Sequence, residues 1–470
     1  MRVRSLPVLL VLPVLLLVLA ASVGSCGRGP VHDAASDAGG PSASASVSPA
    51  ELKARAEHGE RLFIAWCGGC HGDRGRADGP AAAVITPKPR NLVTDKFKIR
   101  STPGGKPPRR DDIFATVTRG LAGTPMPSFA FLSEDERWLI VDHVRRLAGL
   151  DKKPEVEAIA VSTEPESTPA SIAHGKEIYG KLGCAGCHGA EGKGDGGSSK
   201  ELHDDKGQLL PARDYTKGLY LGGDTALSIR TRFLTGMDGT PMPSFADSLP
   251  NANDAWDLAH YILSLRAPKE PTPGDKVEWG KRVVEEKHCA SCHIVEHQGG
   301  QVGPSLDVIG AKLRFDWAKA FLADPPSQGK IYPYTPYRMP NLGLSPDEID
   351  AVLAYLASNA HRSYPEPEPP LPTFDADTIG KGKLIYFLRC TECHNLGAVI
   401  PTPVAKQQGP DLINLSKRLR FEFVGPWVKN PKELNPYTRM IVTNLTPEEV
   451  TQVSAFVWST SVEAQKGTAK

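Results

Sequence analysis

Residues 67–71 read CGGCH, two cysteines and a histidine in a fixed spacing. The same spacing, Cys-x-x-Cys-His, returns as CAGCH, CASCH and CTECH at 184–188, 289–293 and 390–394. The four copies use eight of the nine cysteines in a chain of 470 residues. With 9 cysteines and 13 histidines in the chain, chance would supply only about 0.005 copies. The repetition therefore reflects one chemical requirement that the chain meets four times.

Cys-x-x-Cys-His is the attachment signature of c-type haem. Two thiols add to the vinyl groups of the porphyrin, and the adjacent histidine reaches the iron from the proximal side. The sequence therefore predicts four covalent haem c groups. The predicted attachment residues are Cys67, Cys70, Cys184, Cys187, Cys289, Cys292, Cys390 and Cys393. The predicted proximal metal ligands are His71, His188, His293 and His394.

The N-terminus predicts a targeting segment. A basic start and an apolar run over 6–21 precede Val23-Gly24-Ser25-Cys26, which resembles a bacterial lipobox. We expect residues 1–26 to be a lipoprotein signal peptide, Cys26 to carry lipid, and 27–50 to be a flexible tether. The alternative is an uncleaved N-terminal transmembrane helix. Either anchor would place the protein on the periplasmic face of a bacterial membrane.

Proline-rich segments divide the rest of the chain. They lie at 151–170, 267–275 and 361–375, and proline at this density favours semi-rigid, extended spacers. One Cys-x-x-Cys-His motif lies in each interval between them. The sequence therefore predicts four tandem repeats, which we call the first to fourth repeats, at 51–150, 171–266, 276–360 and 376–462.

Each predicted repeat begins and ends with a helical pattern. A glycine precedes the first motif cysteine by eight or nine residues, with apolar residues on the same helix face: Gly59, Gly175, Gly280 and Gly382. Three closing helices begin with a capping box: Ser133 with Glu136, Ser345 with Glu348, and Thr446 with Glu449. Asn251 and Asp254 hold those places less clearly in the second repeat. Since no segment alternates well enough to form a sheet, the predicted fold class is all-α.

A second set of iron ligands is predicted from the scarce methionines. Four of the six recur once per repeat, 55, 54, 46 and 46 residues after the motif histidine: Met126, Met242, Met339 and Met440. A thioether opposite histidine raises the reduction potential of the iron and closes it to small ligands. Met440 lacks the proline that follows the other three. Met237 and His203 are the alternative ligands in the second repeat.

The proximal histidines also need orientation, commonly by donation from the second ring nitrogen to a backbone carbonyl. Gly303-Pro304 and Gly409-Pro410 are expected to supply this carbonyl in the last two repeats. In the first two repeats the candidates are Pro80, Pro87, Pro89 and Pro211. Arg90 and Arg213 are candidates to hold a haem propionate, with a plain surface role as the alternative.

The order of glycine, motif, methionine and closing helix resembles class I cytochrome c, and the resemblance covers all four repeats. It implies small all-helical domains, each wrapped round one haem. The third repeat looks like the haem-c subunits of nitric oxide reductases, and the first two look more like those of haem-copper oxidases. In the family an aromatic residue of the closing helix packs on the opening glycine. Tyr261, Tyr355 and Phe456 match this residue, whereas Val144 does not.

These features favour a tetrahaem electron-transfer protein that relays electrons between redox partners, free or as a subunit of a respiratory complex, rather than an enzyme. The alternative is a haem enzyme of the peroxidase or nitrite/nitric oxide reductase type with one open-coordinate haem. Structural zinc would need four ligands per site, and a redox disulfide would leave the repeated histidine unexplained.

Charge adds one hypothesis about partners. The chain carries 55 Lys and Arg against 54 Asp and Glu and shows no nucleic-acid-binding motif, so nucleic acid is not an expected partner. The first repeat has a basic stretch that would steer an acidic partner or face the membrane; the alternative is a solvated loop. This stretch comprises Lys96, Lys98, Arg100, Lys106, Arg109 and Arg110.

Overall fold

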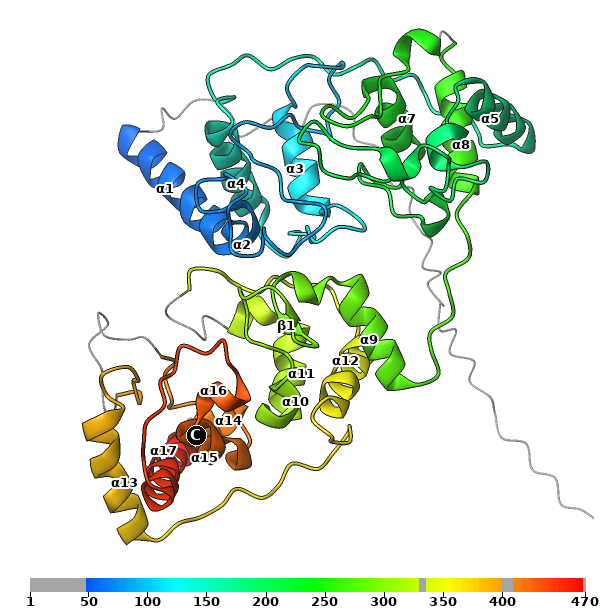
Figure 1. The fold of residues 1–470 in the computed structure, drawn as a ribbon. Helices are drawn as coiled ribbons and strands as arrows, with labels where there is room; N and C mark the ends of the chain where they lie inside the picture. Colours follow the sequence, from blue (N-terminus) through cyan, green and yellow to red (C-terminus); the bar gives the residue numbers. More distant parts are fainter. Residues whose placement is uncertain (1–47, 250, 329–334, 399–408, 468–470) are drawn as a thin grey trace, which may run out of the picture. The chain divides into compact units, whose positions relative to one another are not determined.

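The computed structural model describes residues 48–249, 251–328, 335–398 and 409–467. The predicted signal peptide, Cys26 and residues 27–47 of the predicted tether lie outside these residues. The last residues of the predicted tether, Pro49 and Ala50, already belong to the first helix. The prediction of an all-α protein is confirmed (Figure 1). Within the described ranges the two named strands, β1 (Ile294–Val295) and β2 (Gln298–Gly299), form a short antiparallel hairpin. None of the helices described there is long and apolar enough to cross a membrane.

The helices of the first two repeats follow the same order. The first repeat contains α1 (Pro49–Trp66), α2 (Gly68–His71), α3 (Arg110–Arg119) and α4 (Glu134–Leu147). The second contains α5 (Pro169–Lys181), α6 (Ala185–His188), η1 (Ser199–Glu201), η2 (Tyr215–Lys217), α7 (Ala226–Thr235), η3 (Ala246–Ser248) and α8 (Asp254–Ser264).

The last two repeats keep the opening and closing helices and add short helices between them. The third contains α9 (Lys276–Glu286), η4 (Cys289–Ser291), β1, β2, α10 (Ile309–Lys312), α11 (Phe315–Ala323), η5 (Pro325–Gln328) and α12 (Pro346–Ser358). The fourth contains α13 (Ala376–Arg389), α14 (Leu415–Arg418), α15 (Phe421–Lys429), α16 (Pro431–Leu434) and α17 (Pro447–Gly467).

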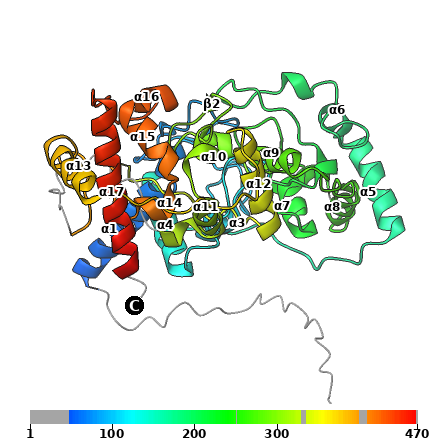
Figure 2. The same cartoon turned by 90° about the horizontal axis from the view of Figure 1, so that it is seen from below.

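The opening helix packs against the closing helix in every repeat: α1 on α4, α5 on α8, α9 on α12 and α13 on α17 (Figures 1 and 2). Each crossing is made at the predicted glycine. A Cβ atom on Gly175, Gly280 or Gly382 would lie 2.0, 2.0 or 1.9 Å from a carbonyl oxygen of the closing helix, and one on Gly59 would lie 2.5 Å from Leu139 O. Only hydrogen fits there, so the glycine sets how closely the two backbones approach.

The residue that covers each glycine lies four positions after the contacted carbonyl. It is Tyr261, Tyr355 or Phe456 in the last three repeats, as the sequence suggested. In the first repeat the contacted carbonyl is that of Leu139, so the equivalent residue is His143 and not Val144. The His143 ring lies 5.0 Å from that of Phe63 and fills the aromatic place.

The closing helices begin where the capping residues predict. Ser133 and Ser345 form the full capping boxes of α4 and α12. The backbone N–H of Glu449 donates to Thr446 Oγ1 at 3.2 Å, and the Glu449 carboxylate accepts from Thr446 N at 2.8 Å. In the second repeat α8 starts at Asp254 after Asn253, whose side chain makes no capping bond.

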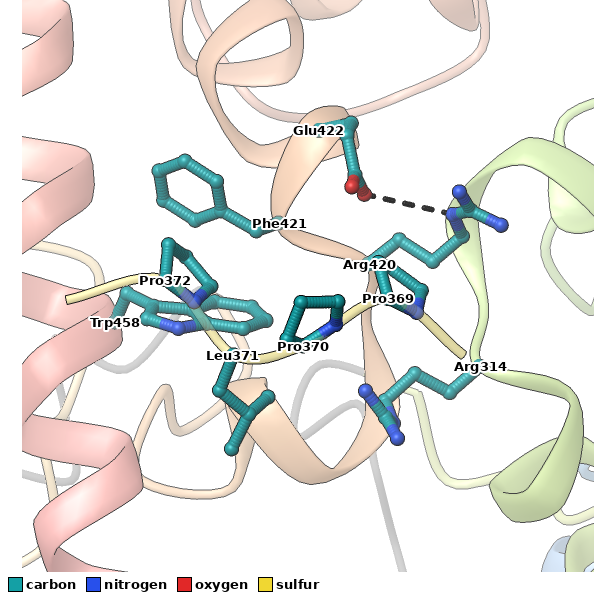
Figure 3. A pocket seen from close by; sticks show the side chains of 9 residues that line it. All are labelled: Arg314, Pro369, Pro370, Leu371, Pro372, Arg420, Phe421, Glu422 and Trp458. Atoms are coloured by element: carbon teal, nitrogen blue, oxygen red, sulfur yellow. Dashed lines mark ion pairs between the residues drawn. The ribbon is translucent and has the colours of Figure 1, made fainter. Parts of the chain in front are cut away.

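The proline-rich segments are docked rather than free spacers. Pro369 to Pro372 run past Phe421 and Trp458 of the fourth repeat (Figure 3). Upstream, the Glu368 carboxylate accepts from Phe315 N at 2.6 Å, and Glu366 pairs with Arg420 at 3.5 Å. These contacts join the third repeat, the linker and the fourth repeat.

The first linker is anchored in the same way. Ser162 accepts from Trp256 Nε1 at 2.9 Å, and Glu155 pairs with Arg145 at 2.8 Å. One end of the linker therefore binds the first repeat and the other end binds the second.

Two glycines of α13 test the crossing directly. Gly382→Ala should lower stability by roughly 3 kcal/mol, because the new methyl group must push α17 away. Gly380→Ala lies in the same helix with no atom within 4 Å of its Cβ, and it should stabilise by roughly 0.5–1 kcal/mol. Calorimetric unfolding of the haem-loaded protein measures both. Equal effects of the two substitutions would contradict the crossing.

Candidate functional site

Each Cys-x-x-Cys-His motif forms one helical turn. The histidine N–H donates to the carbonyl of the first cysteine in all four motifs, at 2.9 Å in three and 3.0 Å in the third. This i to i+4 bond places the first cysteine and the histidine on one face of the turn, with the second cysteine beside them. The backbone thus brings two thiols and an imidazole together locally in every repeat.

The imidazole of each motif is oriented by a backbone carbonyl. Nδ1 donates to that carbonyl in all four: His71 to Arg90 O at 2.8 Å, His188 to Arg213 O at 3.1 Å, His293 to Pro304 O at 2.7 Å and His394 to Pro410 O at 2.9 Å. Burial lowers the pKa of all four imidazoles, and the carbonyl bond opposes this. A neutral ring that donates from Nδ1 leaves its Nε2 lone pair available to a metal.

The expected carbonyls of Pro304 and Pro410 are therefore confirmed. In the first two repeats the carbonyls belong to Arg90 and Arg213, and not to the prolines proposed from the sequence. The glycine before the proline also has a role in the last two repeats. A Cβ on Gly303 would lie 2.3 Å from His293 Cε1, and one on Gly409 would lie 2.4 Å from His394 Cε1. The glycine allows the ring to lie flat against the backbone.

Burial also affects the first thiol of every motif. It raises the pKa of Cys67 to about 12, and the pKa of Cys184, Cys289 and Cys390 to about 11. These groups stay neutral thiols at physiological pH, and the thiolate that drives disulfide exchange is scarce.

A large apolar cavity adjoins the motif in the second repeat. The space between its lining atoms, open mouth included, is about 1270 Å³. Cys184, Cys187 and His188 line one part of it, and Met242 with its flanking prolines lines another. The structure therefore brings the predicted attachment residues and the predicted distal methionine around one cavity, which fits a haem.

The methionine loops of the first two repeats have the same backbone bonds. Leu121 N donates to Met126 O, and Met126 N donates to Thr124 Oγ1 at 3.3 Å. In the second repeat Met237 holds the place of Leu121, and Met242 holds that of Met126. Met237 lines the cavity too, but its equivalent is a leucine, which cannot be an iron ligand. The comparison favours Met242.

Met440 uses the same threonine bond, since its N–H donates to Thr438 Oγ1 at 3.2 Å. The fourth loop therefore keeps the local geometry of the first two despite its missing proline. Met126, Met242, Met339 and Met440 are all half-buried. The competing His203 is exposed and donates to Glu201 O at 2.7 Å.

The sequence reasoning missed Tyr215. Its hydroxyl lies 3.0 Å from His188 Nε2, and the two rings stack at 4.4 Å. Two residues after each carbonyl that holds the histidine, the other repeats have Leu92, Leu306 and Leu412. Aligning the four repeats on the residue that supplies this carbonyl would have identified Tyr215 as the exception. The sequence did not reveal which residues supply the carbonyl in the first two repeats.

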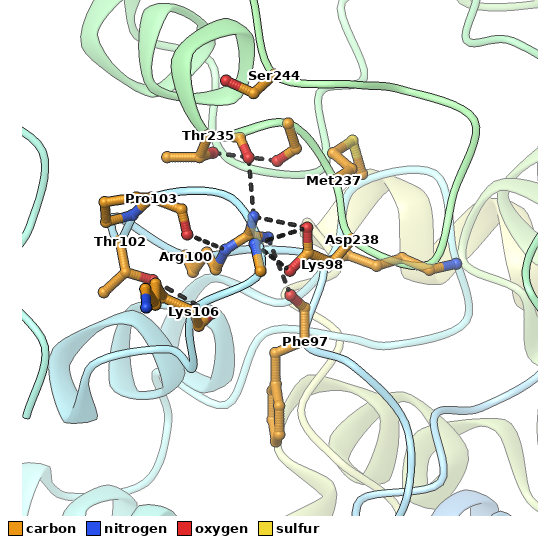
Figure 4. A network of polar contacts seen from close by, with 12 residues as sticks. Phe97, Lys98, Arg100, Thr102, Pro103, Lys106, Thr235, Met237, Asp238 and Ser244 are labelled. Carbon is orange, nitrogen blue, oxygen red and sulfur yellow. Dashed lines mark hydrogen bonds and ion pairs between the residues drawn. The ribbon is translucent and has the colours of Figure 1, made fainter. Parts of the chain in front are cut away.

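The basic stretch of the first repeat is partly structural. Arg100 is 1% exposed, and its guanidinium donates to Asp238 Oδ1 and Thr235 O of the second repeat, both at 2.8 Å (Figure 4). Arg110 pairs with Asp142 at 2.8 Å. Lys96 and Lys106 are exposed. The arginines therefore hold the fold together, and only the lysines remain for a steering role.

Comparisons with known proteins identify cytochrome c domains in the chain. The family model described as Cytochrome c matches residues 172–266 and 277–360, and the model of cbb3-type cytochrome c oxidase subunit III matches 54–144. The cbb3-type cytochrome c oxidase subunit FixP of Sinorhizobium medicae is 26% identical in an alignment of 189 positions, and the match covers 37% of this chain. The match spans 61% of that relative, about three fifths of its length.

A solved structure is also similar, the reducing HAO-like protein complex of Kuenenia stuttgartiensis. It has 36% sequence identity and a TM-score of 0.43, and the match covers 45% of this chain and 96% of that chain.

The fold and the site together define a protein built from cytochrome c domains with covalently held haem c. The chain belongs to the multihaem c-type cytochromes.

Gly303 offers a test of histidine orientation. In Gly303→Ala the new methyl group would displace the His293 ring from Pro304 O, so one haem per chain should lose its normal axial geometry. Electron paramagnetic resonance of the oxidised protein should then show a high-spin signal of about one haem. Gly197→Ala, whose Cβ would meet no atom within 4 Å, is the control. An unchanged spectrum in Gly303→Ala would contradict the role of this bond.

The buried arginine offers a second test. Asp238→Asn should destabilise the protein by roughly 3 kcal/mol, because it leaves the Arg100 charge buried without its partner. The loss in Arg100→Met combined with Asp238→Asn should be smaller than the sum of the single losses. Asp111→Asn removes an exposed partner of Arg109 and should cost less than about 0.5 kcal/mol. Calorimetric unfolding midpoints of the single and double variants measure these losses. If the loss in the double variant equals the sum of the single losses, Arg100 and Asp238 do not stabilise the protein as a pair.

Proposed function

We propose that the protein is a tetrahaem cytochrome that relays electrons between redox partners at the periplasmic face of a bacterial membrane. One observation carries the proposal: four motifs share the same histidine-to-carbonyl bond, which orients the four imidazoles through Nδ1 in the same way. Cys67, Cys70, Cys184, Cys187, Cys289, Cys292, Cys390 and Cys393 would attach four haems. His71, His188, His293 and His394 would be the proximal ligands, and Met126, Met242, Met339 and Met440 the distal ones.

Haem supplies one-electron redox chemistry at nearly constant geometry. The chain's own residues would tune it: thioether and neutral imidazole favour the reduced iron, and apolar surroundings limit water. The boundaries of the four domains would follow the repeats given above. Haem would also fill much of each small core, which explains how four such short repeats can be stable.

The partners would be an electron donor and an electron acceptor. The relative from Sinorhizobium medicae is named a subunit of a cbb3-type cytochrome c oxidase, which supports a role beside a respiratory complex for this chain. The lipobox-like Val23–Cys26 supports anchoring by lipid on Cys26. Mass analysis of the mature protein should find Cys26 as its lipid-bearing first residue.

The competing proposal is an enzyme in which one haem iron lacks its distal ligand. The fourth repeat is the candidate for that haem, because Met440 departs from the pattern of the other three methionines. The bond from Met440 N to Thr438 argues against it, because the fourth methionine loop then matches those of the first two repeats. Carbon monoxide binding to the native reduced protein would favour the enzyme.

A methionine series tests both haem number and ligation. The purified protein should weigh its polypeptide plus four haems and show a sulfur-to-iron charge-transfer band when oxidised. Replacing Met126, Met242, Met339 or Met440 with alanine should each remove about a quarter of that band, since each thioether serves one iron. Met237→Leu should leave it intact. A band that survives all four single substitutions unchanged would refute the ligation, and fewer than four haems would refute the count.

A further inference from the structure

The first and third repeats meet at their Cys-x-x-Cys-His motifs. Val302 lies next to Gly69 of the first motif, and its N–H donates to Cys292 O of the third motif at 3.0 Å, so the side chains of Cys70 and Cys292 lie close enough to interact. Each is the second cysteine of its motif, although 222 residues separate them in the sequence. Both are partly buried, so the contact lies within the protein and not on its open surface.

Neighbouring contacts hold the two motifs in this position. Arg338 N donates to Ala65 O at 2.9 Å, directly before the first motif. The Tyr337 hydroxyl donates to Asp73 Oδ1 at 3.2 Å, directly after it. Both residues belong to the loop that carries Met339, so the methionine loop of the third repeat packs on the motif of the first.

The space between the motifs is small. A Cβ on Gly69 would lie 3.4 Å from Val302 Cγ1, and one on Gly68 would lie 3.1 Å from the Tyr337 ring. Glycine at both middle positions of the first motif allows this approach. In the second repeat a Cβ on Gly186, at the place of Gly69, would meet no atom within 4 Å.

The other neighbouring repeats meet away from their cysteines. The second repeat reaches the first through Arg213, which donates to Gly123 O at 3.4 Å. The third and fourth repeats share a backbone bridge between Leu313 and Leu419. Among the described residues, cysteines of two different repeats lie against each other only at Cys70 and Cys292.

We propose that the haems of the first and third repeats form a directly coupled pair whose edges meet at Cys70 and Cys292. Each sulfur would be bonded to a former vinyl carbon of its own haem. The path from one porphyrin edge to the other would then consist of two carbon–sulfur bonds and one contact between sulfurs. In such a transfer one haem would be oxidised as the other was reduced, and no other group would change its oxidation state. Electrons would therefore pass from the first repeat to the third without crossing the second.

This inference rests on the proposed haem at each motif, and the experiment separates the two. The purified holoprotein is studied by circular dichroism in the Soret region, where two porphyrins in close contact give a bisignate couplet. Gly69→Glu would place a charged side chain between the motifs without changing any haem ligand. Glutamate is tolerated at this place of a motif, since the fourth motif has Glu392 there. Gly186→Glu makes the same change where there is open space.

The wild type and Gly186→Glu should show the couplet, and Gly69→Glu should lose more than half of its amplitude while keeping four haems by mass. Tyr337→Ala should also lower the amplitude of the couplet. This second variant tests the pairing if Gly69→Glu does not fold. An undiminished couplet in these variants, an equal loss in Gly186→Glu, or no couplet in a wild type with four haems would overturn the pairing. A wild type with fewer haems would instead refute the proposed function.

Discussion

The close crossing of the opening and closing helices is the constraint on which the rest of the structure depends. At each crossing a glycine lies so near a carbonyl oxygen of the other helix that a methyl group could not enter. Because the motif follows the opening helix within a few residues, the crossing fixes where the cysteines and the histidine emerge. The methionine loop leads into the closing helix, so the same crossing fixes the other side of the site.

The histidine-to-carbonyl bond is the second common element, and it tolerates different sequences. Two repeats supply the carbonyl from proline after a glycine, and two supply it from arginine. What is shared is the position of an oxygen atom and not a residue type. This explains how the repeats can diverge widely while each presents a neutral imidazole in one orientation.

Much of the fold could be predicted because its signals are local. Motif spacing, the opening glycines and the capping residues such as Ser345 lie within a few positions of what they determine, and the structure has them where the sequence placed them. In contrast, which residue of the closing helix faces the opening glycine depends on how two helices far apart in the sequence pack together. His143 was missed as the partner of Gly59 because a histidine in an aromatic place has no signature in the sequence alone. The carbonyls of Arg90 and Arg213 were also missed. Every residue has a backbone carbonyl, so the residue type does not indicate which one accepts the histidine bond. Contacts between repeats, such as that of Arg100 with Asp238, depend on surfaces far apart in the chain.

The docked linkers bear on how such a chain can change over generations. Glu155, Ser162, Glu366 and Glu368 occupy set places in the linkers and bind partners on the flanking repeats. If recombination exchanged one repeat, or replaced a linker with an unrelated spacer, these linker groups would lose their hydrogen-bond and ion-pair partners. Each repeat is therefore tied to its neighbours by specific linker contacts, and one repeat could not be exchanged for another without replacing those contacts as well.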